Sequence, residues 1–399
     1  MDWGFAYTGH YKEMESCPEC GTSRWKEEIF KKSNGHKKVA AKEFLTIPLG
    51  PQIQALHCHP QTAKDMMYLQ EKISEVQRKL RNGEDINIHD DIATGTQLID
   101  ALHKGRIQPF NSLFMQSLDG TQIYQDKNSD SWIMIYILFI VCPGLRYKKG
   151  LVLPGGIIAG PNNLVNMESF LFPGLYHISA LQKEGLQIWD ALNQTYFQAM
   201  LIYWLTSADG PGSVHVSGLV GHKGVCACQL FCGLKGRRLE GKPTHYLAFL
   251  KPNNYSIPGC DHDNLTPSAI KNGSSLDYPK KCAYLLKSTG SNYKTCRRET
   301  GISCPSILLG LQPQGIISVP ATFGGDAMHC LILNLGEILT KLWHGTLECS
   351  PSDDFTLWTW AVLHGVTWVT HGKAVAACKQ YIPGSFDYPL QNIAEKVNS

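Results

Sequence analysis

Two strings decide the fold of this chain: Phe114-Met-Gln-Ser-Leu-Asp119-Gly-Thr-Gln-Ile-Tyr124 and Leu201-Ile-Tyr-Trp-Leu-Thr-Ser-Ala-Asp209-Gly-Pro211. Each string places an aspartate near the end of an apolar run. Two carboxylates that meet on neighbouring strands can hold divalent cations for in-line phosphoryl transfer. The pair Asp119 and Asp209 therefore predicts an acidic site at the end of a sheet.

The segments around these aspartates alternate between strand and helix patterns. The expected strands are Leu113–Leu118 with Thr121–Tyr124, then Trp132–Cys142, Leu151–Ile158 and Tyr196–Thr206, and Met167–Leu181 has a helical apolar period. Asp119-Gly120 interrupts or closes the first strand, and Asp-Gly is also the favoured two-residue hairpin turn. Because parallel pairing needs a crossover helix, this order predicts an α/β fold with a ribonuclease H-like mixed sheet.

The rest of the chain divides by composition. We expect a zinc-knuckle-like segment at 1–50, a helical linker region at 51–110 with a helix over Thr62–Arg81, and the core with its cysteine cluster at 111–251. An irregular insertion follows at 252–305, and a mainly helical insertion after the fourth strand spans 306–399, with a second helix over Phe355–Lys379.

The composition is that of a globular chain of 399 residues, with 43% hydrophobic and 18% charged residues. The net charge of +3 does not by itself indicate nucleic-acid binding. Trp132–Cys142 is too short to span a bilayer, so we expect no membrane partner. The 14 cysteines without an apolar signal segment favour a reducing compartment and metal ligation over disulfides.

Two cysteine groups have spacings used by zinc. Cys17 and Cys20 form a Cys-Pro-Glu-Cys-Gly knuckle whose turn directs both thiolates at one ion, with His36, His57, Cys58 and His59 as candidates for the missing ligands. Two unliganded thiols are the alternative. In the second group Cys228, Cys232 and His245 are favoured, Cys226 could replace Cys228, and Cys260 or His262 could complete the set.

The chain resembles the transposases of fungal CACTA-type elements, in particular the Plavaka and Kyakuja-Dileera-Zisupton group. The matching strings follow one another along almost the whole chain. They include Ala6-Tyr-Thr-Gly9 before the Cys17 knuckle, Leu118-Asp-Gly120, Pro143-Gly-Leu-Arg-Tyr147, Ser169-Phe-Leu-Phe-Pro173, Gly221-His-Lys-Gly224, Asp326-Ala-Met-His329 and Lys341-Leu-Trp-His-Gly345.

The resemblance implies a DDE-type transposase that cuts and joins DNA on an RNase H-like core in the nucleus. Asp119 and Asp209 match the first two acids and would hold Mg²⁺ or Mn²⁺, and Asp326 and His329 match a D-x-x-H signature. The implied partner is DNA at transposon ends, and the reading allows a homo-oligomer. Basic residues in two clusters would contact phosphates: Lys37, Lys38, Lys235, Arg237 and Arg238.

The chain also departs from the family. The family's third acid is expected beyond Ser399, which predicts a truncated or decayed copy without strand-joining activity. The glycines around Asp209 predict a loosely held backbone there. A non-catalytic DNA-binding or protein-interaction module is therefore the alternative function, and a nuclease that uses Glu337 is a third. Asp326 could equally cap a helix.

Overall fold

A computed structural model of the chain describes residues 4–108, 110–122, 130–160, 164, 166–270, 277–326, 328–349, 354–381 and 390–395. Contacts between residues divide the chain into two compact units, residues 1–325 and residues 326–399. The described strands all belong to the first unit, and the described part of the second unit is helical.

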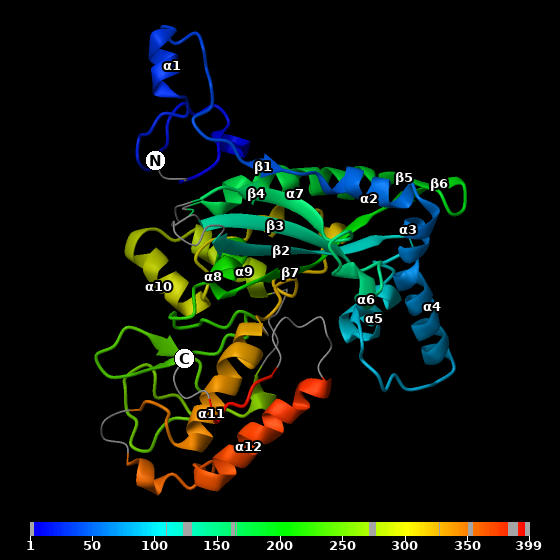
Figure 1. The fold of residues 1–399 in the computed structure, drawn as a ribbon. Coiled ribbons are helices and arrows are strands. Elements are labelled where there is room, and N and C mark those ends of the chain that lie inside the picture. The colour runs from blue at the N-terminus through cyan, green and yellow to red at the C-terminus, as the bar shows by residue number, and fades with distance from the viewer. Residues whose placement is uncertain are drawn as a thin grey trace. The chain divides into compact units, whose positions relative to one another are not determined.

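The first unit is built on a five-stranded mixed sheet in the order β1-β4-β3-β2-β7 (Figure 1). Its strands are β1 Leu45–Thr46, β2 Ser112–Gln122, β3 Asp130–Leu138, β4 Leu153–Ile158 and β7 Leu201–Ala208. β3 is antiparallel to both β2 and β4, whereas β7 is parallel to β2. The predicted mixed α/β sheet is confirmed at this level.

β2 runs without a break through Asp119-Gly120. Asp119 pairs with Ile133 and Gly120 pairs with Trp132 on β3. The hairpin-turn alternative for Asp119-Gly120 is therefore wrong, because these two residues are part of a long ladder of backbone pairs.

The crossover helix is α7, Met167–Glu184, which connects the antiparallel part of the sheet to the segment that returns as β7. Asn166 caps its first turn by accepting a hydrogen bond from the Ser169 N–H at 3.0 Å. Gly174 passes the Tyr136 hydroxyl so closely that a Cβ there would lie 3.1 Å from it. α7 therefore covers the face of the sheet on which Tyr136 stacks edge-on against Phe114, with ring centroids 5.8 Å apart.

The region expected to form one strand over Tyr196–Thr206 holds two. β6, Thr195–Ala199, pairs with β5, Leu186–Asp190, as a separate hairpin, and β7 begins after Met200. The Asp190 carboxylate stabilises the hairpin turn by accepting hydrogen bonds from the backbone N–H groups of Leu192 and Asn193. The apolar run from Tyr196 to Thr206 therefore changes its pairing partner, from β5 before Met200 to β2 after it.

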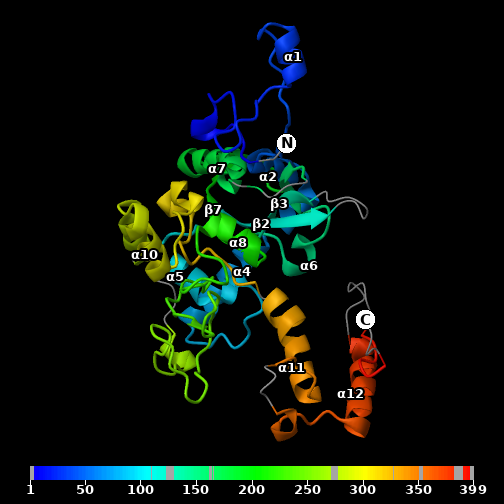
Figure 2. The same ribbon diagram turned by 90° about the vertical axis from the view of Figure 1, so that its left-hand side faces the viewer.

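The first unit also contains the helices α1 Glu27–Lys32, α2 Leu49–His57, α3 Pro60–Asp65, α4 Tyr68–Arg81, α5 Thr96–His103 and α6 Pro143–Arg146. α2 lies beside α7 (Figure 2), where the Gly50 N–H donates to His177 Nε2 at 3.2 Å. The helix expected over Thr62–Arg81 is divided at Met66-Met67. Arg146 at the end of α6 is 2% exposed and forms a bidentate ion pair with Asp91, at 2.9 and 2.7 Å.

The remainder of the first unit follows β7. It comprises α8 Gly210–Ser217, β8 Arg237–Arg238, β9 His245–Tyr246, α9 Asp277–Leu286 and α10 Gly290–Thr300. Ile316 and Phe323 form isolated parallel bridges with Tyr203 and Thr206 of β7. The stretch from Ile316 to Phe323 thus packs on the free edge of the sheet at β7, within the range 306–399 that was expected to form the helical insertion.

The second unit contains a π-helix, Met328–Leu335, followed by α11, Gly336–His344, and α12, Gly365–Ala377. The helix expected over Phe355–Lys379 is shorter, since α12 starts only at Gly365. Across the described residues of both units, no helix combines the length and the apolar character that a membrane crossing requires.

Candidate functional site

Asp119 lies near the end of β2, where the sheet becomes exposed. Leu118 is buried and Asp119 is exposed, since alternate residues of a strand point to opposite faces. The Asp119 carboxylate accepts no hydrogen bond from the described residues. It is therefore open to a ligand from solvent.

Asp209 follows the last residue of β7 and is the N-cap of α8. Its Oδ1 accepts a hydrogen bond from the Gly212 N–H at 2.7 Å, and Pro211 occupies the first turn, where its lack of an N–H has no cost. A Cβ at Gly212 would lie 2.8 Å from Asp209 Oδ1. The glycine thus permits the cap, which fixes the Asp209 side chain at the start of α8, and a loosely held backbone at this position stays a prediction.

The register of the sheet makes the two aspartates neighbours. Leu118 of β2 pairs with Ala208 of β7 in parallel. Asp119 and Asp209 each follow directly after one member of this pair, at the same end of the two strands. Adjacent strands lie about 4.8 Å apart. Proteins bind Mg²⁺ or Mn²⁺ through one or two carboxylates, with the remaining positions left to water and phosphate, and two aspartates on adjacent strands can supply such a pair.

The donor set fits one divalent cation. Both oxygens of Asp119 and the second oxygen of Asp209 make no hydrogen bond to the described residues, and all are hard donors. In the described part of the chain, no group of three or more His, Cys, Asp or Glu side chains could hold a metal ion. A second cation would lack an anionic ligand there.

His215 of α8 lies close to this pair and was not anticipated from the sequence. Burial lowers the pKa of His215, and the negative charge of Asp209 offsets this effect only in part. Its ring meets Trp132 of β3 edge-on, with centroids 5.7 Å apart. A neutral imidazole at pH 7 adds no positive charge that would repel a cation, and no motif in the sequence marks His215.

Asp326 and His329 belong to the second unit, and the structure brings them together. Asp326 Oδ1 accepts a hydrogen bond from the His329 N–H at 3.0 Å, which is the cap that the sequence allowed. The His329 Nδ1 also lies 2.8 Å from Asp326 Oδ2, an ion-pair distance without hydrogen-bond alignment. In the same unit, Glu337 is exposed and paired with Lys341 at 2.5 Å, as an ordinary surface residue would be.

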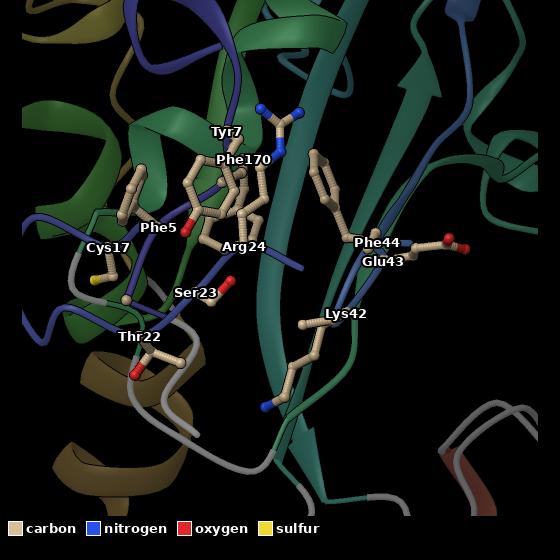
Figure 3. Close-up of a pocket in the computed structure, with 14 residues that line it drawn as sticks. Phe5, Tyr7, Cys17, Thr22, Ser23, Arg24, Lys42, Glu43, Phe44 and Phe170 are labelled. Carbon is tan, nitrogen blue, oxygen red and sulfur yellow. The ribbon is translucent and has the colours of Figure 1, made fainter. Parts of the chain in front are cut away.

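The Cys17 knuckle forms the tight turn that its sequence predicts. The Gly21 N–H donates to the Cys17 carbonyl at 2.9 Å, and Gly21 has a φ of +68°. Cys17 is buried and Cys20 is exposed. Figure 3 shows Cys17 beside Phe5 on the wall of a cavity of about 270 Å³. No third ligand joins the two thiols among the described residues, so zinc here stays a prediction.

The second cysteine group is only partly assembled. The Cys228 and Cys232 side chains interact with each other, and burial raises the pKa of the Cys232 thiol. They border a different cavity from His245, whose Nε2 is buried without a hydrogen-bond partner in the described structure. The proposed set of Cys228, Cys232 and His245 does not come together as one metal cluster.

The candidate DNA-contact residues differ sharply in their surroundings. Lys37 and Lys235 are exposed, whereas Lys38 is paired with Glu15 at 2.8 Å. Arg238 is half-buried beside His245.

Arg237 is only 3% exposed. Its guanidinium donates five hydrogen bonds to the backbone carbonyls of Ala248, Phe249, Cys260, His262 and Asp263. This arginine therefore organises the protein's own backbone and is not presented to DNA.

Comparison of the sequence with protein-family models and with curated proteins found no match.

Proposed function

We propose that this chain is a transposase-derived DNA-binding protein with an RNase H-like core, related to the CACTA-type Plavaka transposases. The resemblance of the sequence strings supplies the family. The strand order β4-β3-β2-β7, with antiparallel, antiparallel and parallel neighbours, supports the core. The bridges of Ile316 and Phe323 beside β7 add support, because an RNase H-like sheet continues at this edge.

The observation that carries the proposal is the adjacency of Asp119 and Asp209 at the ends of parallel strands. β2 presents one carboxylate to solvent, and the cap of α8 holds the other in place. The two side chains would bind one Mg²⁺, which when bound supplies Lewis-acid chemistry to a phosphodiester. His215 restricts one side of the site as a neutral group, because burial lowers its pKa.

A metal-binding experiment tests this site directly. Asp119→Asn and Asp209→Asn each remove a charge while keeping side-chain size, and Asn also preserves the cap of α8. Titration calorimetry with Mn²⁺ should show one site in the parent chain and none in either variant. Asp85→Asn, at an exposed position in the 82–91 loop, is the matched control and should bind as the parent does. Equal Mn²⁺ binding by all four proteins would refute the site.

The DNA-binding part has its own test. Duplex DNA should shift in electrophoresis, and the shift should weaken as salt rises, because phosphate contacts release counterions. A missing shift, or one that salt does not change, would contradict this part of the proposal.

An active transposase and a non-catalytic module derived from one are the two forms of this proposal, and the small number of acids at the strand ends favours the module. In the described structure Asp119 and Asp209 follow paired residues of adjacent strands, and no group of three or more possible metal ligands forms, whereas two-metal phosphoryl transfer requires more anionic ligands than two carboxylates provide. We therefore expect the 399-residue chain to bind DNA but not to join a pre-cut transposon end to target DNA in Mg²⁺. Joined product that Asp119→Asn abolishes would instead establish an active transposase.

A further inference from the structure

A basic cavity lies apart from the two aspartates, between the loop that follows α8 and the helix α10. It has a volume of about 570 Å³ and is lined by His222, Lys223, His245, Lys294, Arg297 and Arg298, among others. No Asp or Glu is among the described residues that line it. This volume is in the range of small-molecule pockets, about 300–1,000 Å³.

Backbone contacts hold the walls of this cavity in place. The Val220 N–H donates to the Gly301 carbonyl at 2.9 Å, and the His245 N–H donates to the Lys223 carbonyl at 3.2 Å. Gly301 ends α10 with a φ of +73°, and a Cβ there would lie 2.5 Å from the Cys226 carbonyl oxygen. The loop, β9 and α10 are thus joined by backbone hydrogen bonds, and the approach of the loop to α10 requires a glycine at position 301.

The cationic side chains come from two directions. Lys294, Arg297 and Arg298 are spaced i, i+3 and i+4 on α10 and therefore share a face of the helix. Lys223 approaches from the loop. Arg297 uses its Nε to donate to Ser303 Oγ at 3.1 Å, which orients the guanidinium while its terminal nitrogens make no hydrogen bond to the described residues. Charges of one sign collected in this way attract an anion.

His245 packs into the wall of the cavity. Its side chain is 8% exposed, and its Nε2 has no hydrogen-bond partner within the described residues. The Nε2 atom itself exposes less than 1 Å² to solvent, so it does not face the open cavity, and the imidazole forms part of the wall.

We propose that this cavity binds phosphate groups, with Lys294, Arg297 and Arg298 as the principal contacts and Lys223 on the opposite side. Arginine forks match phosphate oxygens in geometry, and lysine adds a point charge. The phosphate chemistry stands on the cavity alone. That the phosphates belong to a single DNA strand rests on the proposed function, in which the cavity holds the strand away from the aspartate pair.

The experiment compares two double variants of the full chain. Lys294→Gln with Arg298→Gln removes two exposed cavity charges, and Lys280→Gln with Lys287→Gln removes the same charge from positions that do not line the cavity. Circular dichroism confirms that both fold. Binding of a labelled single-stranded oligonucleotide is followed by fluorescence anisotropy over a salt series, and binding of inorganic phosphate is followed by ³¹P line broadening.

The cavity variant should bind DNA about tenfold more weakly at low salt, with a salt slope lower by about 0.7 for each phosphate that it no longer neutralises. It should also lose phosphate binding, and the control variant should retain both. Loss of phosphate binding with DNA binding unchanged would overturn the DNA assignment and leave a site for a free phosphate ligand. Equal behaviour of both variants would overturn the site altogether.

These outcomes are separate from those of the aspartate site. The cavity variant and the control variant should bind Mn²⁺ equally well. The reason is that the residues lining the cavity lie outside β2 and the start of α8, which carry the two aspartates. If the parent chain binds no Mn²⁺ but binds phosphate, and the cavity variant loses phosphate binding, the metal site is refuted and the phosphate site is supported.

Discussion

Replacing Arg146 with methionine should destabilise the first unit more than most single substitutions. The guanidinium is 2% exposed, donates to Asp91 at 2.9 and 2.7 Å, and donates from Nε to the Val141 carbonyl at 2.8 Å. Arg146→Met leaves the Asp91 carboxylate buried without its counter-ion. Breaking such a pair costs about 3–5 kcal/mol, which corresponds to a factor of roughly 10² to 10⁴ in the folding equilibrium.

Urea denaturation gives the measurement, because a lower midpoint with an unchanged slope reports a loss of stability. A double-mutant cycle with Asp91→Leu isolates the pair. We expect the double variant to be much more stable than the sum of the single losses predicts, since apolar replacement of a buried pair is often close to neutral. Lys79→Met, which breaks the exposed pair with Glu75 at 2.7 Å, is the control and should change the midpoint far less. Strictly additive losses at positions 91 and 146, each no larger than the control, would refute this reasoning.

Four further predictions follow from the site and its surroundings. Asp209→Ala should lower stability by about 1 kcal/mol relative to Asp209→Asn in urea, because only Asn retains the cap of α8. Gly212→Ala should weaken Mn²⁺ binding in calorimetry, since its Cβ would lie 2.8 Å from Asp209 Oδ1; parent-like binding would show that the carboxylate can shift freely. Burial lowers the pKa of His215, so below about pH 6.5 the unfolded chain binds a proton that the folded chain does not. The free energy of unfolding should therefore decrease as the pH is lowered. His215→Gln should reduce that fall in urea midpoints measured across pH 5–7, and an unchanged profile would exclude His215 as its source. Arg237→Met should cost at least about 2 kcal/mol in the same assay, because buried carbonyls lose their donor.

Long apolar runs made much of the sheet predictable. The runs that became β3 and β7, and the helical period of α7, identify the element type from local pattern alone. Gly156 in β4 has a structural reason. A Cβ at this position would lie 2.8 Å from the Leu45 carbonyl oxygen, so β1 can pair with β4 only if residue 156 has no side chain.

Other features depend on partners that are distant in sequence. Whether Asp119-Gly120 turns or continues is decided by its pairing with Ile133 and Trp132, which no local pattern contains. The division of the run at Met200 likewise depends on β5 as a pairing partner. Local propensity could not decide these outcomes, because Asp-Gly suits a hairpin turn and the apolar run suits one long strand, and only the distant pairing partners select the structure observed.

The candidate site shows the same division. Asp119 and Asp209 were recognisable as acids at strand ends, but the role of Gly212 depends on the short distance to Asp209 Oδ1. Arg237 and Lys235 are alike in charge and close in sequence, yet one is buried among carbonyls and the other is exposed. Burial of a charge follows from tertiary contacts, and composition carries no record of them.

The carbonyl set around Arg237 has a consequence for how this part of the protein opens. Five backbone oxygens replace the hydration shell of the guanidinium, and they come from two separate stretches, 248–249 and 260–263. Withdrawal of either stretch would leave a cation only partly solvated, so the two should detach together as one local unfolding unit. Amide hydrogens in 237–263 should therefore exchange with solvent at similar rates. Because His245 lies in this unit, each opening also removes one wall of the basic cavity, and a bound phosphate should slow the exchange of the entire segment.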